Sequence, residues 1–241
     1  MADKSFLETL AYRRSVRVYT QESLDPRRVQ KCIEQATLAP NSSNLQLWEF
    51  YHVTSAEKKA ALAEACLNQS AAKTAQEFVV FVVRKDLWKQ RAQANVAFLK
   101  AQFDQHQHRN AKREKMALTY YQKLIPTLYT DFWGIAGRLK RLFATLRGWS
   151  GPMYRQVLAR DLDIVAHKST ALAAQTFMLS MAHICYDTCP MEGFDSVRVK
   201  KILGVSNKAM ISMVVSCGIR DEKGIYGPQF RVPFTTVYNE I

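Results

Sequence analysis

The spacing of hydrophobic residues predicts three helices in the first part of the chain. The first begins with the capping box Ser5-Phe6-Leu7-Glu8, and the second begins at Asp25-Pro26 and ends at Pro40. A third helix follows Ser55, its expected cap, and runs through Cys66. In the first two, apolar residues recur every three or four positions, so one side of each helix is expected to be buried.

Strand patterns lie between and after these helices. Trp48–Val53 alternates as a strand does, and Phe78–Val83 is so uniformly apolar and β-prone that it predicts a central strand. Met210–Cys217 predicts another apolar strand. The tail from Arg231 to Tyr238 starts with a cation and predicts an extended segment that continues as a strand. The chain therefore mixes helices and strands.

A run without charged residues extends from Ser169 to Tyr186. Its length approaches the ~20 residues that a membrane-spanning helix needs. It contains polar residues, however, and no other such run accompanies it; they include Ser169, Thr170, Gln175, Ser180 and His183. We therefore predict a buried core helix.

The stretch Cys189–Asp195 predicts a rigid loop between this helix and a short helix that Asp195 caps and Gly204 ends. Pro190 fixes one backbone torsion and Gly193 frees another, so main-chain N–H groups can turn outward toward a flat ligand. The same pattern also fits an ordinary connection between helices.

The middle of the chain, about 87–151, differs from the rest in being basic and aromatic. Between Arg84 and Arg155 there are 15 lysines and arginines against 4 acidic residues, and the whole chain carries a net charge of +13. No linker divides the 241 residues, so we predict one domain, 1–241, with an insertion at 87–151. Such a charge suits an anionic cofactor, substrate or surface.

Within the insertion, Arg138 to Trp149 predicts an amphipathic basic helix, with Leu139, Leu142, Phe143 and Leu146 on its apolar side. This helix could lie on an anionic membrane surface, cover an active site as a lid, or simply be a solvated helix of the domain. Aromatic residues among basic ones also occur in single-stranded nucleic-acid proteins, but no nucleic-acid motif is present. We expect no nucleic-acid partner.

Five cysteines, without the spacing of a metal site, argue against a disulfide framework and against zinc. Cys185 and Cys189 are either a redox pair or two buried free thiols. The first residues lack the pattern of a secretory signal, so a cytoplasmic location is expected, peripheral to a membrane if the basic helix binds one.

Two polar clusters carry candidate binding chemistry. Arg13-Arg14-Ser15-Val16-Arg17 is either a solvated helix end or a phosphate grip, because guanidinium groups match phosphate oxygens. The run Pro40–Trp48 is either a turn or a source of hydroxyl and amide groups for a polyhydroxylated ligand. Asn68 lies in the loop before the central strand, where it reaches a ligand or caps the turn.

Four motifs follow one another in a recognisable order: Arg-Arg-Ser-x-Arg at 13–17, Pro-x-Ser-x-Asn-x-Gln-x-Trp at 40–48, Pro-x-Glu-Gly-Phe-Asp at 190–195 and Arg-x-Pro at 231–233. Across residues 5–85 and 160–241 this order resembles the nitroreductase family of FMN-dependent oxidoreductases. The sequence departs from the family pattern at Leu47, Ala71 and Gln229, where the family commonly has proline, a basic residue and lysine.

The resemblance implies a role for each matching position. Arg13, Ser15 and Arg231, with Arg14 beside them, match the phosphate-binding groups, and Arg17 matches the cation at the pyrimidine edge of the flavin. The segment that reaches FMN from the partner subunit matches Pro40, Asn41, Ser42 and Asn44. Asn68 matches an amide near the ring. The loop facing flavin N5 and O4 matches Pro190, Met191, Glu192 and Gly193, with the backbone of Glu192 and Gly193 orienting N5.

The resemblance further implies an α+β fold, in which a mixed, mainly antiparallel sheet is flanked by helices. It implies a homodimer with FMN at the interface and a C-terminal strand that crosses to the partner's sheet. The implied activity is ping-pong hydride transfer from NAD(P)H through FMN to a nitroaromatic, quinone or similar acceptor, without a metal. Reductive dehalogenation, flavin-consuming chemistry and a membrane- or partner-binding flavoprotein remain alternatives, as do NADH and NADPH.

Overall fold

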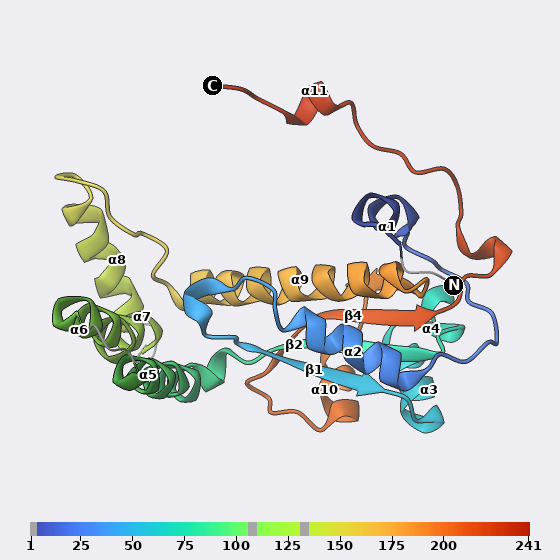
Figure 1. The fold of residues 1–241 in the computed structure, drawn as a ribbon, viewed down its shortest axis with the longest axis horizontal. Coiled ribbons are helices and arrows are strands. Elements are labelled where there is room, and N and C mark those ends of the chain that lie inside the picture. Colours follow the sequence, from blue (N-terminus) through green and yellow to red (C-terminus); the bar gives the residue numbers. More distant parts are fainter. Residues whose placement is uncertain (1–3, 106–109, 131–134) are drawn as a thin grey trace.

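A four-stranded antiparallel sheet forms the centre of the molecule in the computed structural model, which describes residues 4–105, 110–130 and 135–241 (Figure 1). The strand order is β1-β2-β4-β3. The strands are β1 (Trp48–Val53), β2 (Glu77–Val83), β3 (Asp187–Met191) and β4 (Met210–Gly218). Every ladder is antiparallel, and an isolated parallel bridge joins Ser15 to Thr188 outside them. The predicted α+β class and largely antiparallel sheet are confirmed.

Strand β2 lies in the middle because its side chains are apolar on both faces. All seven of its residues are buried. Phe78, Val80 and Val82 pack on one face with α3 (Ala56–Ala65), α4 (Ser70–Lys73) and α10 (Ser196–Leu203), whereas Val79 and Phe81 pack on the other with α2 (Pro26–Ala36) and α9 (Ala159–His183). This alternation follows from the two-residue period of a strand, so helices cover both faces.

The local signals at helix ends are confirmed where a side chain can cap the backbone. Ser5 forms the capping box of α1 (Phe6–Tyr12), and Asp25 and Ser55 cap α2 and α3. Asp195 accepts the backbone N–H groups of Val197 and Arg198, and Gly204 ends α10 in the left-handed conformation with φ 68°. These positions are determined by neighbours within one helical turn.

The uncharged run is part of α9, whose inner side is buried against the sheet by Ala173, Ala174, Phe177 and Met181. The buried core helix predicted there is confirmed. Among the described residues, no helix has both the length and the apolar character to cross a membrane.

The expectation of a loop at Cys189–Asp195 was wrong for its first half, because Asp187–Met191 is strand β3. Pro190 has no N–H to donate, and a proline is tolerated in a sheet only at an edge. Strand β3 is such an edge, with β4 as its neighbour and Pro190 opposite Val215. The turn that was expected is confined to Glu192–Phe194, before α10 begins.

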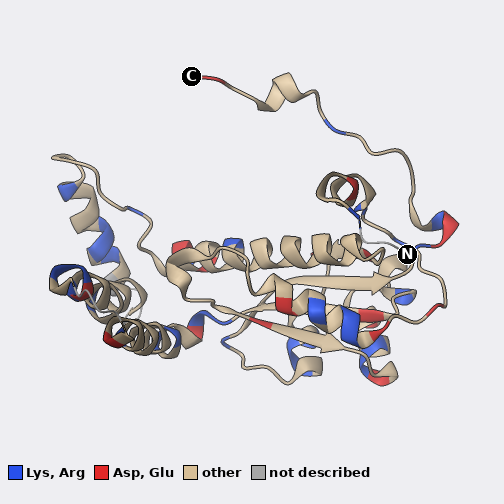
Figure 2. Cartoon of the chain, in the orientation of Figure 1, with Lys and Arg blue, Asp and Glu red and all other residues tan. Residues whose placement is uncertain are grey.

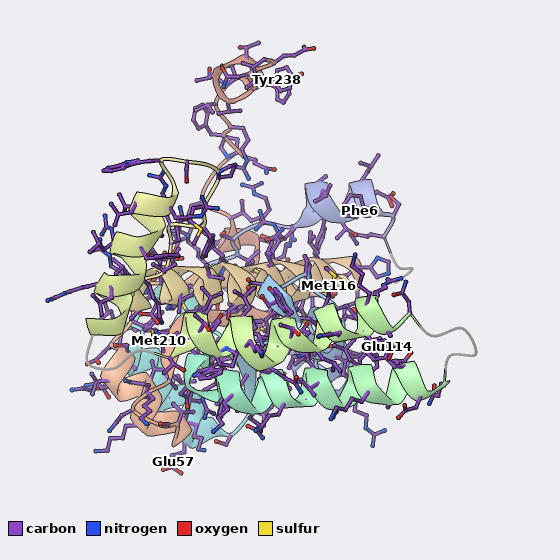
Figure 3. The ribbon with its side chains drawn as sticks, turned by 90° about the vertical axis from the view of Figure 1, so that its left-hand side faces the viewer. Phe6, Glu57, Glu114, Met116, Met210 and Tyr238 are labelled. Carbon is purple, nitrogen blue, oxygen red and sulfur yellow. The ribbon has the colours of Figure 1, made fainter. Side chains whose placement is uncertain are left out.

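The expectation of a strand in the tail is also wrong for this single chain. Phe234–Val237 is a short helix, α11, with the rings of Phe234 and Tyr238 stacked 4.8 Å apart. The tail projects from the body (Figure 1), and Tyr238 lies far above it in Figure 3. A strand needs a neighbouring strand for its backbone groups, whereas a helical turn satisfies some of them locally.

The basic insertion forms a group of helices at one end of the molecule (Figure 1). It contains η2 (Lys85–Leu87), α5 (Trp88–Gln105), α6 (Ala111–Thr119), η3 (Tyr120–Leu124), α7 (Ile125–Tyr129) and α8 (Ile135–Arg147). A separate apolar cluster containing Ala92, Ile125, Leu45 and Ala166 attaches these helices to the sheet domain. The predicted amphipathic helix at 138–149 corresponds to α8.

Candidate functional site

A cationic cavity of about 330 Å³ lies where the two ends of the chain meet. Arg13, Arg14, Ser15 and Arg17 line one side of it, and the segment 225–231 lines the other. Residues more than 200 positions apart in the sequence therefore share one site, as the motifs predicted. Four guanidinium groups, those of Arg13, Arg14, Arg17 and Arg231, border the cavity. This is a donor set for an anion such as phosphate.

Backbone hydrogen bonds hold the arginine segment between β3 and the C-terminal segment. The Val16 N–H donates to the Thr188 carbonyl at 3.1 Å, and the Arg17 N–H donates to the Gly224 carbonyl at 2.8 Å. Gly224 is required there because an added Cβ would lie 2.5 Å from the Val18 carbonyl oxygen. The side chains of Arg13 and Ser15 are thus presented by a fixed backbone.

Side chains add a second set of contacts across the cavity. Arg14 Nη2 donates to the Gly227 carbonyl at 2.6 Å, and the guanidinium of Arg17 lies 5.4 Å from the centre of the Tyr226 ring. Arg231 donates to the carbonyl of its neighbour Phe230 at 2.7 Å. Arg14 and Arg17 therefore hold the C-terminal segment beside the cavity, and Tyr226 is a wall residue that the sequence motifs did not indicate.

An ion pair between the buried Asp187 and the partly exposed Arg220 lies next to the arginine segment. The Asp187 side chain, 2% exposed, accepts from Arg220 Nε at 2.9 Å and from the Arg220 N–H at 2.9 Å, and Arg220 Nη2 bonds the same carboxylate. Arg220 Nη2 also donates to the Tyr12 carbonyl at 3.1 Å. Burial and then the charge of Asp187 raise the pKa of Tyr12 to about 12, so its hydroxyl stays protonated. The network joins β3 to the backbone just before Arg13.

The turn after β3 lies at the other end of that strand. Gly193 lies five positions after Thr188, which bonds the arginine segment; at the rise of a strand five positions span at most about 16 Å. The Gly193 carbonyl accepts from Gln69 Nε2 at 2.7 Å, and Gln69 also bonds the Cys66 carbonyl at 3.1 Å. Sequence reasoning missed Gln69, although it selected its neighbour Asn68.

The loop that contains Asn68 has an uncommon backbone. Leu67 and Asn68 have φ of 59° and 53°, a left-handed conformation that asparagine tolerates better than most residues. Asn68 is exposed beside the contact of Gln69 with the turn. Glu192 and Gly193 are exposed as well, whereas the Met191 side chain is buried in the core. Met191 therefore contributes little to the surface of this turn.

The thiol of Cys189, on β3, is held neutral. Burial raises the pKa of Cys189, and the charge of Arg17 acts in the opposite direction with a smaller effect. Cys189 and Cys185 are free thiols in this structure, and Cys185 Sγ accepts a hydrogen bond from Lys4 Nζ at 2.7 Å. A neutral buried thiol is a poor nucleophile, so Cys189 acts as a core residue here.

The segment Pro40–Asn44 contacts α9 near the middle of the helix, away from its last residue, His183. The Ser42 N–H donates to Ser169 Oγ at 3.2 Å, whereas the chain before Arg13 bonds α9 at its last residue, with the Lys4 N–H on the His183 carbonyl at 3.2 Å. Fourteen residues of helix separate Ser169 from His183, about 21 Å. One chain therefore does not bring Asn41, Ser42 and Asn44 to the arginine cavity.

This segment is tightly held by its own contacts and by the insertion. Asn41 Oδ1 accepts the Gln46 N–H at 2.8 Å, and the Asn44 carbonyl accepts from Asn95 Nδ2 at 2.9 Å. Ser43 Oγ lies 2.6 Å from the Tyr120 hydroxyl. Left-handed φ values occur at Ser43, Asn44 and Gln46, a concentration of strain that is typical of functional sites. The insertion residues Asn95 and Tyr120 could be found only from the tertiary structure.

The structure is thus an α+β fold with a helix-covered antiparallel sheet and a cavity lined by four arginines. Comparison with known proteins identifies its class, because residues 10–219 match the Nitroreductase family. The NADH dehydrogenase of Thermus thermophilus is 26% identical over 225 residues, covering 93% of this chain and 90% of that protein.

Solved structures give the same fold. The nitroreductase-like protein YdfN from Bacillus subtilis superposes with a TM-score of 0.74 at 21% identity, covering 98% of each chain. A nitroreductase-like protein from Exiguobacterium sibiricum, solved in complex with FMN, superposes with a TM-score of 0.68 at 21% identity, covering 100% of this chain and 99% of that one. The chain belongs to the nitroreductase family.

Proposed function

We propose that this chain is an FMN-dependent NAD(P)H oxidoreductase that works as a homodimer by a ping-pong mechanism. FMN, when bound, would supply the hydride-transfer chemistry between NAD(P)H and an electron-poor acceptor such as a nitroaromatic or a quinone. The observation that carries the proposal is the convergence of Arg13, Ser15 and Arg231 on one cavity in a nitroreductase-family fold. The FMN complex among its structural relatives supports FMN as the cofactor.

The residues present fit the phosphate of FMN. Arg13 and Arg231 line the cavity from opposite ends of the chain, and the Ser15 hydroxyl adds a neutral donor. Charge-assisted hydrogen bonds from guanidinium groups to phosphate are among the strongest available to a protein. Gln229 also lines the cavity, so an amide stands where the family commonly has a cation. We assign phosphate binding to Arg13, Ser15 and Arg231, with Arg14 bracing the wall.

The turn at Glu192–Gly193 is suited to a flat ring. Its backbone is exposed, and the Gln69 amide fixes the Gly193 carbonyl, so the neighbouring N–H groups have a set direction. We assign to this backbone the orientation of flavin N5, and to Asn68 a contact with the ring. Arg17, exposed near β3, supplies a cation that favours negative charge on the pyrimidine edge of the ring.

A second copy of the chain completes the site in this proposal. Pro40, Asn41, Ser42 and Asn44 lie too far along α9 to reach the arginine cavity of their own chain. The apolar residues Phe6, Leu7 and Leu172 are exposed on α1 and α9, a surface that suits burial in a dimer. In such a dimer the tail would exchange its helical turn for a strand on the partner's sheet, where β1 is an edge.

In this proposal the insertion forms a lid over the active site. An apolar cavity of about 440 Å³ lies between α7, α8 and the start of α9, and Ser42 and Ser43 belong to its wall. Its lining includes the aromatic residues Tyr120, Tyr129 and Phe143. Because Ser42 is assigned to the flavin site of the partner, this cavity is placed to receive the acceptor and favours an apolar, aromatic one.

The purified protein is expected to be yellow, with a flavin absorption spectrum, and to oxidise NAD(P)H only when an acceptor is present. Spectra before and after NAD(P)H addition under anaerobic conditions, followed by addition of a quinone, separate the two half-reactions. Protein that stays colourless after incubation with FMN, or that oxidises no NAD(P)H with either a quinone or a nitroaromatic, contradicts the proposal.

Replacement of Gly193 by valine is expected to weaken FMN binding about tenfold or more without changing thermal stability. A Cβ at Gly193 meets only the flexible end of Gln69, at 3.2 Å, so the fold accommodates it, whereas a branched side chain blocks close approach of a ring. Gly151→Val, at a position with nothing within 4 Å of an added Cβ, is the matched control. Equal FMN affinity in both variants would show that Gly193 does not contact the flavin.

A further inference from the structure

Helix α8 turns its most apolar stripe toward solvent. Leu139, Leu142 and Leu146 are 62%, 57% and 50% exposed, and Trp149, just beyond the helix, is 79% exposed. We call these four residues the leucine ridge. Their spacing of three and four residues places them along one side of the helix. An exposed apolar stripe of this length is uncommon unless it has a partner.

The opposite side of α8 contacts the rest of the insertion and is partly polar. Ala144 is 1% exposed, and Lys140 Nζ donates to the carbonyls of Leu128 at 3.3 Å and Thr130 at 2.5 Å. In a helix that only covers a core, the leucines would face inward and the lysine outward. Here the arrangement is reversed, so the packing of α8 on its own chain does not account for the leucine ridge.

The surroundings of the ridge are basic. Residues 135–160 include six lysines and arginines and no acidic residue. Arg138 and Arg141 are exposed on α8 next to Leu139 and Leu142, and Arg147 bonds Ser150 Oγ at 2.6 Å at the end of the helix. Figure 2 shows basic segments and no acidic ones along α8. Any partner of the ridge therefore has to be apolar and negatively charged together.

We propose that α8 docks on an anionic lipid surface, with the leucine ridge inserted at the boundary of headgroups and acyl chains. Leucine side chains and an indole bury apolar area there, while arginines on the flanks reach the headgroup phosphates. Trp149 at the end of the helix suits the amphipathic interface region. Helix α8 lies at the end of the molecule farthest from α3 and α4, where a flat surface can approach it (Figures 1 and 3).

A second copy of this chain fits the ridge less well. In a symmetric contact through the ridge, the six lysines and arginines of 135–160 in one copy would face the same six of the other, with no acidic residue between them. An anionic bilayer supplies negative charge for the flanking arginines and an apolar layer for the leucines. Docking through α8 is independent of flavin chemistry, and it would bring the cavity beside α8 close to lipid-soluble acceptors.

Co-sedimentation of the full-length protein with vesicles tests the proposal. Vesicles of phosphatidylcholine containing phosphatidylglycerol are expected to bind the protein about tenfold or more tightly than vesicles of phosphatidylcholine alone. The difference should disappear at about 1 M salt, where the Debye length is about 3 Å. Equal binding to both vesicle types, or none to either, overturns the proposal.

Two variants on α8 are expected to lose this binding for different reasons. The double variant Leu142→Asp with Leu146→Asp prevents the ridge from entering the lipid layer. The double variant Arg138→Gln with Arg141→Gln removes the electrostatic attraction to anionic headgroups. All four residues are exposed, so folding is preserved. Matched controls are Leu67→Asp, at a residue 68% exposed, and Lys112→Gln with Lys115→Gln on α6. Controls that fail like the α8 variants contradict the assignment to α8.

The mass of the protein in solution shows whether a second copy of the chain, instead of a lipid surface, covers the leucine ridge. Light scattering is expected to give the same mass for the α8 variants and the unmodified protein. If the variants instead change the mass while leaving vesicle binding unaltered, the ridge covers another copy of the chain and the proposal is overturned.

Discussion

Replacing Arg13 or Arg231 by glutamine is expected to weaken FMN binding by about 10- to 100-fold each. A hydrogen bond to a charged group contributes about 1.5–3 kcal/mol, and about 1.4 kcal/mol corresponds to a factor of ten in affinity. Both arginines line the same cavity, and neither side chain is part of the ion pair between Asp187 and Arg220. The quenching of FMN fluorescence on binding measures the change directly.

The control for these variants is Arg27→Gln, at an exposed arginine of α2 outside the cavity. It changes the net charge by the same amount, so it reports the general electrostatic attraction of FMN to a basic protein. Two results would refute the assignment: an FMN affinity of Arg13→Gln equal to that of the control, or equal losses for riboflavin, which has no phosphate.

Asp187→Ala is expected to lower the free energy of unfolding by about 1.5–3 kcal/mol, because the partly exposed Arg220 loses its charged hydrogen-bond partner. The carboxylate also accepts the Arg220 backbone N–H, so a second donor loses its acceptor. Urea unfolding at one fixed protein concentration measures the change, since a dimer makes the apparent stability depend on concentration.

The comparison for this variant is Glu64→Gln, which removes one partner of the exposed pair between Glu64 and Arg198. Exposed ion pairs contribute about 0–1 kcal/mol, so this change should be small. FMN affinity should fall in Asp187→Ala as well, because Arg220 anchors the carbonyl of Tyr12, the residue before Arg13. A loss of stability no larger than that of Glu64→Gln would show that the pair contributes little.

The sequence predicted well those elements whose signals are local or strongly periodic. Strand β2 follows from an unbroken apolar, β-branched run, and α10 from Asp195 at one end and Gly204 at the other. The motif arginines were found because their order resembled a family, and the structure brings Arg13 and Arg231 to one cavity. Gln69 and Tyr226 were missed, because their contacts join segments that nothing in the local pattern links.

The sequence by itself determined the family, the core strands and the identity of the cationic residues, because each depends on residue type and near neighbours. Only the tertiary structure decided that Pro190 sits in an edge strand, that Ser42 contacts α9 fourteen residues before its end, and that the leucines of α8 face solvent. Periodicity gives a helix its apolar stripe, but what packs against the helix decides whether that stripe is buried.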